Sequence, residues 1–360
     1  MSEQRLVIDA RMHAHSGIGT YLRHSVPAVA ERLPGVRFEL LHCPGAPLPT
    51  ELARLGTAVP WNVAPLSAHE LFARPPVDAG SLWWSPHFNV PLRWRGRLLV
   101  TLHDLLPVIR PDLGGGRLRR RIVLAWLRRA VARNAVFLCV SAFTQSELRQ
   151  LAFARDVRAT VVPLGVAEAW RDPPRAESSP PYFVYVGLPK RHKNLATLLA
   201  AYARLTSTLP HDLVLITDWS GLRSYDRDAI AMAQRMSPRV RIRSDLPVAD
   251  LMSTVASATA LVHPSVYEGF GLTPLEAMAA GTPVIAGRAG SVPEVCGDAA
   301  LLFDPLDVDG LAAAMLRVAS DVELRSGLAA RGRARAAFYT WSACAARTSA
   351  ELRAAMTDTA

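Results

Sequence analysis

Short apolar runs alternate along this chain with stretches of helical periodicity, and this alternation restricts the possible folds more than any other feature. The runs are rich in β-branched side chains, as buried parallel strands require. Because parallel neighbours need a crossover connection between them, such a pattern predicts an α/β fold with doubly wound sheets. The expected strands are residues 6–9, 36–41, 98–102, 136–140, 182–186, 212–216, 240–243, 260–263, 283–286 and 300–303.

A polar, proline-rich segment interrupts this alternation at residues 172–181. Such a composition is typical of a linker, and 360 residues suit two domains of ordinary size. We therefore predict two doubly wound parallel-sheet domains, residues 1–171 and 182–340, that face each other across a cleft. Ligands of such sheets bind beyond the carboxyl ends of the strands, so the residues that follow each run are the candidates for a site.

Composition excludes several classes of protein. No apolar run approaches the length of a membrane span, and no secretory signal is visible, so a cytoplasmic protein is expected. The four cysteines lie far apart, which favours buried free thiols over disulfide or metal chemistry. The net charge of +10 raises a nucleic-acid-binding protein as an alternative, but the arginines are spread along the chain and no recognised nucleic-acid motif accompanies them.

The lysines are more informative than the total charge. Of 41 basic residues only two are lysines, and both lie in one segment, 187–194, directly after an expected strand. Lys190, Arg191 and Lys193 stand there at the start of a helix, where Asn194 is the expected cap. The segment does not match a Walker loop. It predicts a diphosphate site, and the alternative is a solvated basic turn.

The sharpest pattern is a glycine-containing loop that follows the expected strand 260–263. Glu268 lies on this loop and Glu276 about one turn into the next helix, so both carboxylates are expected to point into one pocket. The backbone N–H groups of the loop between them suit phosphate oxygens. One carboxylate would accept hydrogen bonds from sugar hydroxyls and the other from a ribose diol. A solvated helix start is the alternative.

Two features of the first domain are weaker. Gly17 and Gly19 follow the first strand and open a helix, an arrangement that suits phosphate contact or a plain tight turn. His103 ends the strand 98–102, where it would donate to a substrate hydroxyl or phosphate, or serve a structural purpose.

Two further patterns have no place in the predicted site. The D-x-D triplets 226–228 and 307–309 do not follow a buried strand, so we expect neither to hold a metal–diphosphate complex. The helix expected over residues 117–133 mixes arginines with Leu124 and Trp126. It would either lie on an anionic membrane surface or bury an apolar stripe beneath a basic face.

Taken together, these segments resemble the retaining, nucleotide-sugar-dependent glycosyltransferases of family 4, which have the GT-B fold of two Rossmann-like domains. The run from Glu268 to Val284 closely resembles the E-x7-E signature of that family, and the resemblance covers nearly the whole chain. That run lies in a longer segment, 263–285, and the other segments that carry the resemblance are residues 8–11, 16–19, 101–104, 140–144, 162–166 and 187–194.

The resemblance implies roles for the residues already singled out. The second domain would hold the donor: Lys193, with Lys190 or Arg191, would neutralise its diphosphate, Glu276 would bind its ribose and Glu268 the transferred sugar. The backbone of the loop would approach the sugar and the phosphates. From the first domain, Gly17, Gly19 and His103 would close over the donor's sugar and phosphates and face the acceptor. The donor-binding loop residues are Gly269, Phe270, Gly271 and Leu272.

The same resemblance implies a reaction. A glycosyl group would pass with retention, without a metal or other cofactor, from a GDP-mannose-like, UDP- or dTDP-sugar to a glycan, lipid-linked or small-molecule acceptor. One departure from the family is Leu188, where many members carry an arginine, so another cation must supply that charge. The last helix, 341–360, would cross back to the first domain. An epimerase of the same fold is the alternative enzyme.

Overall fold

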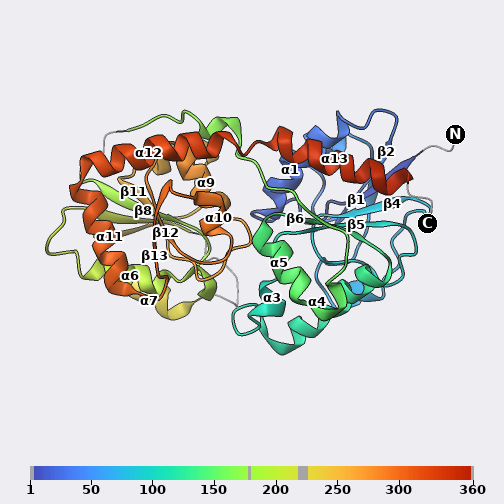
Figure 1. The fold of residues 1–360 in the computed structure, drawn as a ribbon, viewed down its shortest axis with the longest axis horizontal. Coiled ribbons are helices and arrows are strands. Elements are labelled where there is room, and N and C mark those ends of the chain that lie inside the picture. Colours follow the sequence, from blue (N-terminus) through green and yellow to red (C-terminus); the bar gives the residue numbers. More distant parts are fainter. Residues whose placement is uncertain (1–3, 177–179, 218–225, 358–360) are drawn as a thin grey trace. The chain divides into compact units, whose positions relative to one another are not determined.

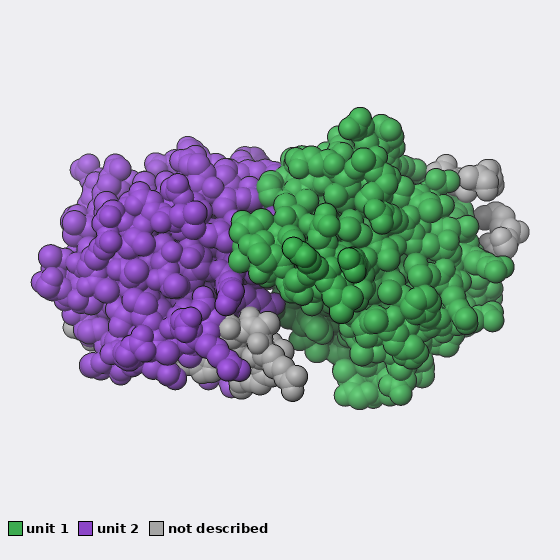
Figure 2. All heavy atoms as spheres, turned by 90° about the horizontal axis from the view of Figure 1, so that it is seen from below, with its two compact units in different colours: residues 1–165, 340–360 green, residues 166–339 purple. Residues whose placement is uncertain are grey.

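The structure is a computed structural model of the 360-residue chain, and it describes residues 4–176, 180–217 and 226–357. The chain forms two compact units, residues 1–165 with 340–360 and residues 166–339 (Figure 1, Figure 2). Of the proline-rich segment 172–181, expected as a linker, residues 172–176 and 180–181 belong to the second unit, and residues 177–179 lie outside the described residues. None of the helices in the described ranges is long and apolar enough to cross a membrane.

The first unit contains a parallel sheet of seven strands in the order β3-β2-β1-β4-β5-β6-β7. Its strands are β1 Arg5–Asp9, β2 Arg37–His42, β3 Thr57–Pro60, β4 Leu82–Ser85, β5 Leu98–Leu102, β6 Val136–Cys139 and β7 Ala159–Val161. Its helices are α1 Ile18–Ala30, α2 Thr50–Ala53, α3 Leu106–Ile109, α4 Gly116–Ala132, α5 Ala142–Gln150 and α13 Trp341–Thr357, with short 3-10 turns at His69–Leu71 and Ala152–Ala154.

The second unit contains a parallel sheet of six strands in the order β10-β9-β8-β11-β12-β13. The strands are β8 Tyr182–Val186, β9 Asp212–Ile216, β10 Val240–Arg243, β11 Ala260–His263, β12 Val284–Gly287 and β13 Ala300–Phe303. The helices are α6 Leu195–Ala203, α7 Arg227–Arg235, α8 Val248–Ala256, α9 Leu272–Ala279, α10 Val292–Cys296, α11 Val308–Ser320 and α12 Val322–Ala337, with 3-10 turns at Glu168–Trp170 and Arg191–Lys193.

Both sheets have the doubly wound arrangement predicted from the alternation of runs. The central strands are buried on both faces, which explains why they appear in the sequence as continuous apolar runs rather than alternating ones. In the second unit α6 and α11 pack on one face of the sheet, and α9 and α12 pack together on the other (Figure 1). The strand order reverses between β8 and β11, so the loops that follow these two strands meet at the switch point where ligands of such sheets bind.

Three strands were not anticipated. β3 and β7 lie at the two edges of the first sheet, and their residues are exposed or half-buried, so neither carries a continuous apolar run. β4 is fully buried but only four residues long, and two of these are Trp83 and Trp84. Short strands of this kind acquire their conformation from the neighbours with which they pair, and the local sequence does not specify it.

Candidate functional site

The loop after β8 is fixed to the segment after β11. Asn194 occupies the N-cap position of α6, as expected, but with left-handed backbone angles and without a hydrogen bond from its side chain to the first turn of the helix backbone. Instead its Nδ2 donates to the carbonyl oxygens of Pro264, at 3.1 Å, and Pro305, at 2.6 Å. A further backbone bond joins the N–H of Val266 to the carbonyl of His192. The two loops at the switch point are therefore held side by side.

Three side chains meet between these loops: the predicted site residues Lys193 and Glu268, and His263. Lys193 Nζ lies 2.7 Å from Glu268 Oε1, and His263 Nε2 lies 2.9 Å from the same oxygen. His263 is the last residue of β11, and its side chain is 3% exposed, against 13% for Glu268 and 22% for Lys193. The cation expected to neutralise a diphosphate and the carboxylate expected to bind a sugar are thus ion-paired without a ligand.

The charge of Glu268 depends on these partners. Burial by itself would raise the pKa of its carboxyl, but the Lys193 ammonium and the His263 ring hold that pKa well below its usual range. Burial lowers the pKa of the neighbouring His192 to about 4, with Lys193 adding to the effect. Glu268 is therefore an anion at neutral pH beside a neutral His192.

A second segment clamps the backbone of Glu268. The N–H of Ser291 donates to the Glu268 carbonyl at 3.0 Å, and the Ser291 hydroxyl donates to the same oxygen at 3.2 Å. Gly290 has a φ of +58°, and a Cβ atom there would lie 2.2 Å from that oxygen and 2.7 Å from the Glu268 nitrogen. Only glycine allows this approach, so the loop between β12 and α10 sets the position of Glu268.

Glu276 occupies a different environment on α9. Its side chain is half-buried, and no described residue pairs with its carboxylate. Burial raises the pKa of this carboxyl to about 8. The helix begins after Gly271, which has a φ of +99°, and no side chain caps this end. The first N–H groups of α9 are thus available for an anion.

The remaining predicted donor residues lie on the same two loops. Phe270 is buried and packs edge-on against Tyr339, with ring centroids 5.7 Å apart, and Leu272 is the first residue of α9. Lys190 directly precedes the 3-10 turn Arg191–Lys193, and Gly269 directly precedes Phe270. Arg191 is exposed, and within the described ranges its guanidinium pairs with no carboxylate.

The two predicted glycines of the first unit differ from each other. Gly17 is exposed, has a φ of +53° and would meet nothing with an added Cβ. Gly19 is buried in the first turn of α1, where a Cβ would lie 2.3 Å from the carbonyl oxygen of His13. Gly19 therefore has a packing reason to be glycine, whereas Gly17 is required only by its backbone angles.

His103 follows β5 and is packed edge-on against Tyr21, with ring centroids 5.0 Å apart. Burial lowers its pKa to about 4, opposed by a backbone hydrogen bond at Pro86, so the ring is neutral at physiological pH. Its Nε2 atom is buried and has no hydrogen-bond partner among the residues the structure describes. An unsatisfied buried nitrogen at a strand end is suited to a ligand hydroxyl.

Sequence reasoning missed a buried charge network in the first unit. Arg11 pairs with both Asp9 and Glu70, and all three side chains are at most 2% exposed. Asn89 Nδ2 donates to Asp9 at 3.2 Å and to Glu70 at 2.8 Å. The Arg11 guanidinium also stacks 3.9 Å from the ring of Trp61. The signals in the sequence are that Asp9 ends the first strand and that Asp9 and Arg11 lie in the segment 8–11, which carries the family resemblance. His263, the last residue of β11, begins the segment 263–285 that carries the family resemblance, but no role was predicted for its side chain.

The two D-x-D triplets begin helices, and their carboxylates bind backbone. Asp226 Oδ1 accepts from the N–H of Ala229 at 3.2 Å, and Asp307 Oδ1 accepts from that of Gly310 at 2.9 Å. Both are therefore N-caps of α7 and α11. In the described part of the chain no cluster of three His, Cys, Asp or Glu side chains could hold a metal ion.

Comparison with known proteins identifies the family. The profile described as "Glycosyl transferases group 1" matches residues 166–335, and "Glycosyltransferase Family 4" matches residues 15–170. The O-antigen chain mannosyltransferase B of Escherichia coli is 31% identical over 74% of this chain and 72% of its own length. This chain belongs to the family 4 glycosyltransferases. It is accordingly a glycosyltransferase with the GT-B fold, as the E-x7-E run indicated.

Further relatives and solved structures agree. An MMP alpha-(1->4)-mannosyltransferase of Mycolicibacterium hassiacum is 31% identical over 64% of this chain and 58% of its own length. The sucrose-phosphate synthase of Thermosynechococcus elongatus has a TM-score of 0.78, with 23% identity over 98% of each chain. Anabaena HepE, solved with UDP and glucose, has a TM-score of 0.75 at 16% identity, covering 98% of this chain and 99% of that one. Relatives named as transferases favour transfer over the epimerase and nucleic-acid-binding alternatives.

Proposed function

We propose that this glycosyltransferase takes its glycosyl group from a nucleoside diphosphate sugar and transfers it with retention of anomeric configuration, without a metal. The observation that carries the proposal is the buried, ionised Glu268, held by Lys193 and His263 at the switch point of the second sheet. An ionised carboxylate accepts hydrogen bonds from sugar hydroxyls, and the ammonium beside it attracts a diphosphate.

The neighbouring groups complete a donor site. Glu276, which has no partner among the described side chains, binds the ribose hydroxyls, and the uncapped N–H groups at the start of α9 approach the phosphates. Lys193 and the exposed Arg191 supply positive charge to the diphosphate, and Arg191 takes the role that an arginine at position 188 has in many family members. The backbone of Gly269 and Phe270 faces the sugar.

These groups would act mainly on the leaving group. Negative charge develops on the nucleoside diphosphate as the glycosidic bond breaks, and fixed cations and N–H dipoles stabilise it there. The leaving phosphate oxygen takes the proton of the attacking acceptor hydroxyl on the same face, which retains the configuration. His103 in the first unit, with its neutral ring, would orient that hydroxyl by a hydrogen bond, and the exposed Gly17 turn would approach the acceptor.

Thermal unfolding with a panel of GDP-, UDP- and dTDP-sugars tests the proposal. GDP-mannose comes first because two of the relatives are named mannosyltransferases. A matched donor at about 100 times its Kd should stabilise the protein by about 2.7 kcal/mol, and EDTA should not reduce this. Glu276→Ala should abolish the shift while the protein remains folded. No stabilisation by any nucleotide sugar, or near-normal transfer by Glu276→Ala, would contradict the assignment.

A further inference from the structure

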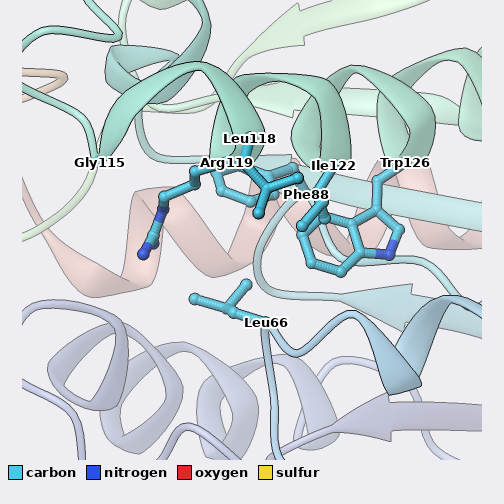
Figure 3. Close-up of a pocket in the computed structure, with 7 residues that line it drawn as sticks. All are labelled: Leu66, Phe88, Gly115, Leu118, Arg119, Ile122 and Trp126. Carbon is cyan, nitrogen blue, oxygen red and sulfur yellow. The ribbon is translucent and has the colours of Figure 1, made fainter.

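A cavity of about 290 Å³ lies wholly within the first unit, beneath the N-terminal half of α4 (Figure 3). Its volume is near the lower end of the ~300–1,000 Å³ typical of small-molecule sites. One face of α4 supplies most of the wall, Leu66 lies opposite it, and Phe88 lies close beneath the helix (Figure 3). The residues from α4 and its first turn are Gly115, Leu118, Arg119, Ile122 and Trp126.

The cavity combines an apolar interior with a positive rim. Arg119 is the charged residue among its seven lining residues, and within the described chain its guanidinium has no ion-pair partner. Gly115 lets the stem of Arg119 lie across the rim, because a Cβ at Gly115 would be 2.7 Å from Arg119 Cδ. α4 contains six arginines and no acidic residue, and Leu118 at the rim is 71% exposed.

The cavity adjoins the strand ends at which an acceptor hydroxyl is expected. His87 follows β4, directly precedes the cavity residue Phe88 and is 8% exposed. Burial holds the pKa of His87 well below its usual range, and both His103 and Arg119 lie close enough to lower it further. The Nδ1 atom of His87, like Nε2 of His103, is buried without a hydrogen-bond partner in the described structure. The two imidazoles are therefore close to each other, and that of His87 directly precedes a cavity residue in the chain.

We propose that this cavity is the acceptor subsite and that it takes a phosphate joined to an apolar chain. The chain enters the cavity among Leu118, Ile122 and Phe88, and the phosphate pairs with Arg119. The acceptor hydroxyl then reaches the imidazoles of His87 and His103. The inference rests on the proposed glycosyl transfer, and it selects a lipid-phosphate-linked acceptor over a free glycan. A free glycan would use neither the apolar wall nor the unpaired arginine.

Calorimetric titration with decyl phosphate, below its micelle concentration, tests the subsite directly. Decyl maltoside supplies the chain without the charge, and inorganic phosphate supplies the charge without the chain. We expect decyl phosphate to bind at least tenfold more tightly than either. Arg119→Gln and Leu118→Asp should each weaken it at least tenfold, and both positions are exposed enough to leave folding intact. Arg121→Gln is the matched control on the same helix, exposed but outside the cavity lining.

Three results would overturn the proposal. Equal weakening by Arg119→Gln and Arg121→Gln would indicate attraction to the helix charge alone. Equal affinity for inorganic phosphate and decyl phosphate would show that the apolar chain does not bind in the cavity. Binding to phosphatidylglycerol vesicles, without binding of monomeric decyl phosphate, would assign α4 to a membrane surface. Thermal unfolding with nucleotide sugars reports on the second unit. Its outcome is therefore independent of whether Arg119 contributes to the affinity for decyl phosphate.

Discussion

At the scale of single residues, the two glutamates of the E-x7-E run differ in the direction in which their pKa values are shifted. Both are buried enough for desolvation to raise their pKa values, but only Glu268 has a cation to reverse that effect. Glu268 is consequently ionised without a ligand, whereas Glu276 is mostly protonated at pH 7. Their common spacing in the sequence conceals this difference, which depends on Lys193 and His263.

Removing the Lys193 ammonium should leave the buried carboxylate of Glu268 without its ion-pair partner and lower the stability of the protein. A carboxyl with a depressed pKa contributes stability above its unfolded pKa, and that contribution is lost as the pH falls through the folded pKa. Lys193→Met should therefore lower the free energy of unfolding by about 1–3 kcal/mol at pH 7, less than for a fully buried pair because both groups are partly exposed. The deficit should shrink toward pH 3. Urea unfolding at both pH values measures it, and Arg191→Met, with the same loss of charge, should change stability little.

Glu276 should show the reverse pH dependence. Its pKa of about 8 lies above the unfolded value, so the folded protein retains a proton that the unfolded chain releases, and stability falls as the pH rises from about 4.5 to 8. Glu276→Gln, which mimics the protonated form, should gain on the order of 1–3 kcal/mol at pH 8.5 and nothing at pH 4. Denaturant unfolding across this range is the measurement, with the exposed Glu31→Gln as the control. A pH-independent difference would contradict the assigned protonation state.

At the scale of elements, the donor loop is positioned by its neighbour in the sheet. The turn after β12 brings Gly290 and Ser291 against the backbone of Glu268, so two adjacent strand ends build one site. This arrangement follows from parallel pairing of β11 with β12, which places their carboxyl ends at the same edge. The α9 helix is in turn held by α12, which packs against it.

Gly290→Ala should displace this loop. A Cβ at Gly290 would overlap the Glu268 backbone, whereas at Gly297, with a nearly equal φ of +56°, it would meet the Arg335 guanidinium at an ordinary 3.7 Å. Both alanines carry backbone strain of about 1–3 kcal/mol. Only Gly290→Ala should also weaken donor binding, by at least tenfold, in titrations with the matched nucleotide sugar. Equal donor affinity in the two variants would show that the clamp does not position Glu268.

At the scale of the whole molecule, the last helix belongs to the first unit, although residues 166–339, which form the second unit, separate it in sequence from the rest of the first. Trp341 stacks on His24 with ring centroids 5.1 Å apart, and α13 packs along α1. Glu351 accepts from Thr160 and Arg158, and Arg97 donates to the Met356 carbonyl. Arg239, Arg325 and Arg335 likewise donate to backbone carbonyls.

Trp341→Ala should therefore destabilise the first unit. Removal of a buried tryptophan costs about 3–5 kcal/mol, and the lost ring contacts are with Tyr21 and His24 of α1. Calorimetry should show the transition of the first unit at lower temperature, while the donor-dependent shift of the second unit is retained. The exposed Phe338→Ala is the control, because that ring is 78% exposed. Loss of donor binding in Trp341→Ala would contradict the assignment of α13 to the first unit.

The sequence by itself determined the alternation of strands and helices, the two sheets and the loops that carry Lys193, Glu268 and Glu276. These features depend on neighbouring residues, through side-chain periodicity and turn-forming glycines, so they can be read locally. Tertiary structure alone decided that Lys193 and Glu268, 75 positions apart, form an ion pair, that Arg11 joins Asp9 to Glu70, and that a cavity lies beneath α4. Burial and charge pairing arise between segments that are distant in the chain, and they set the protonation states on which the chemistry of the site depends.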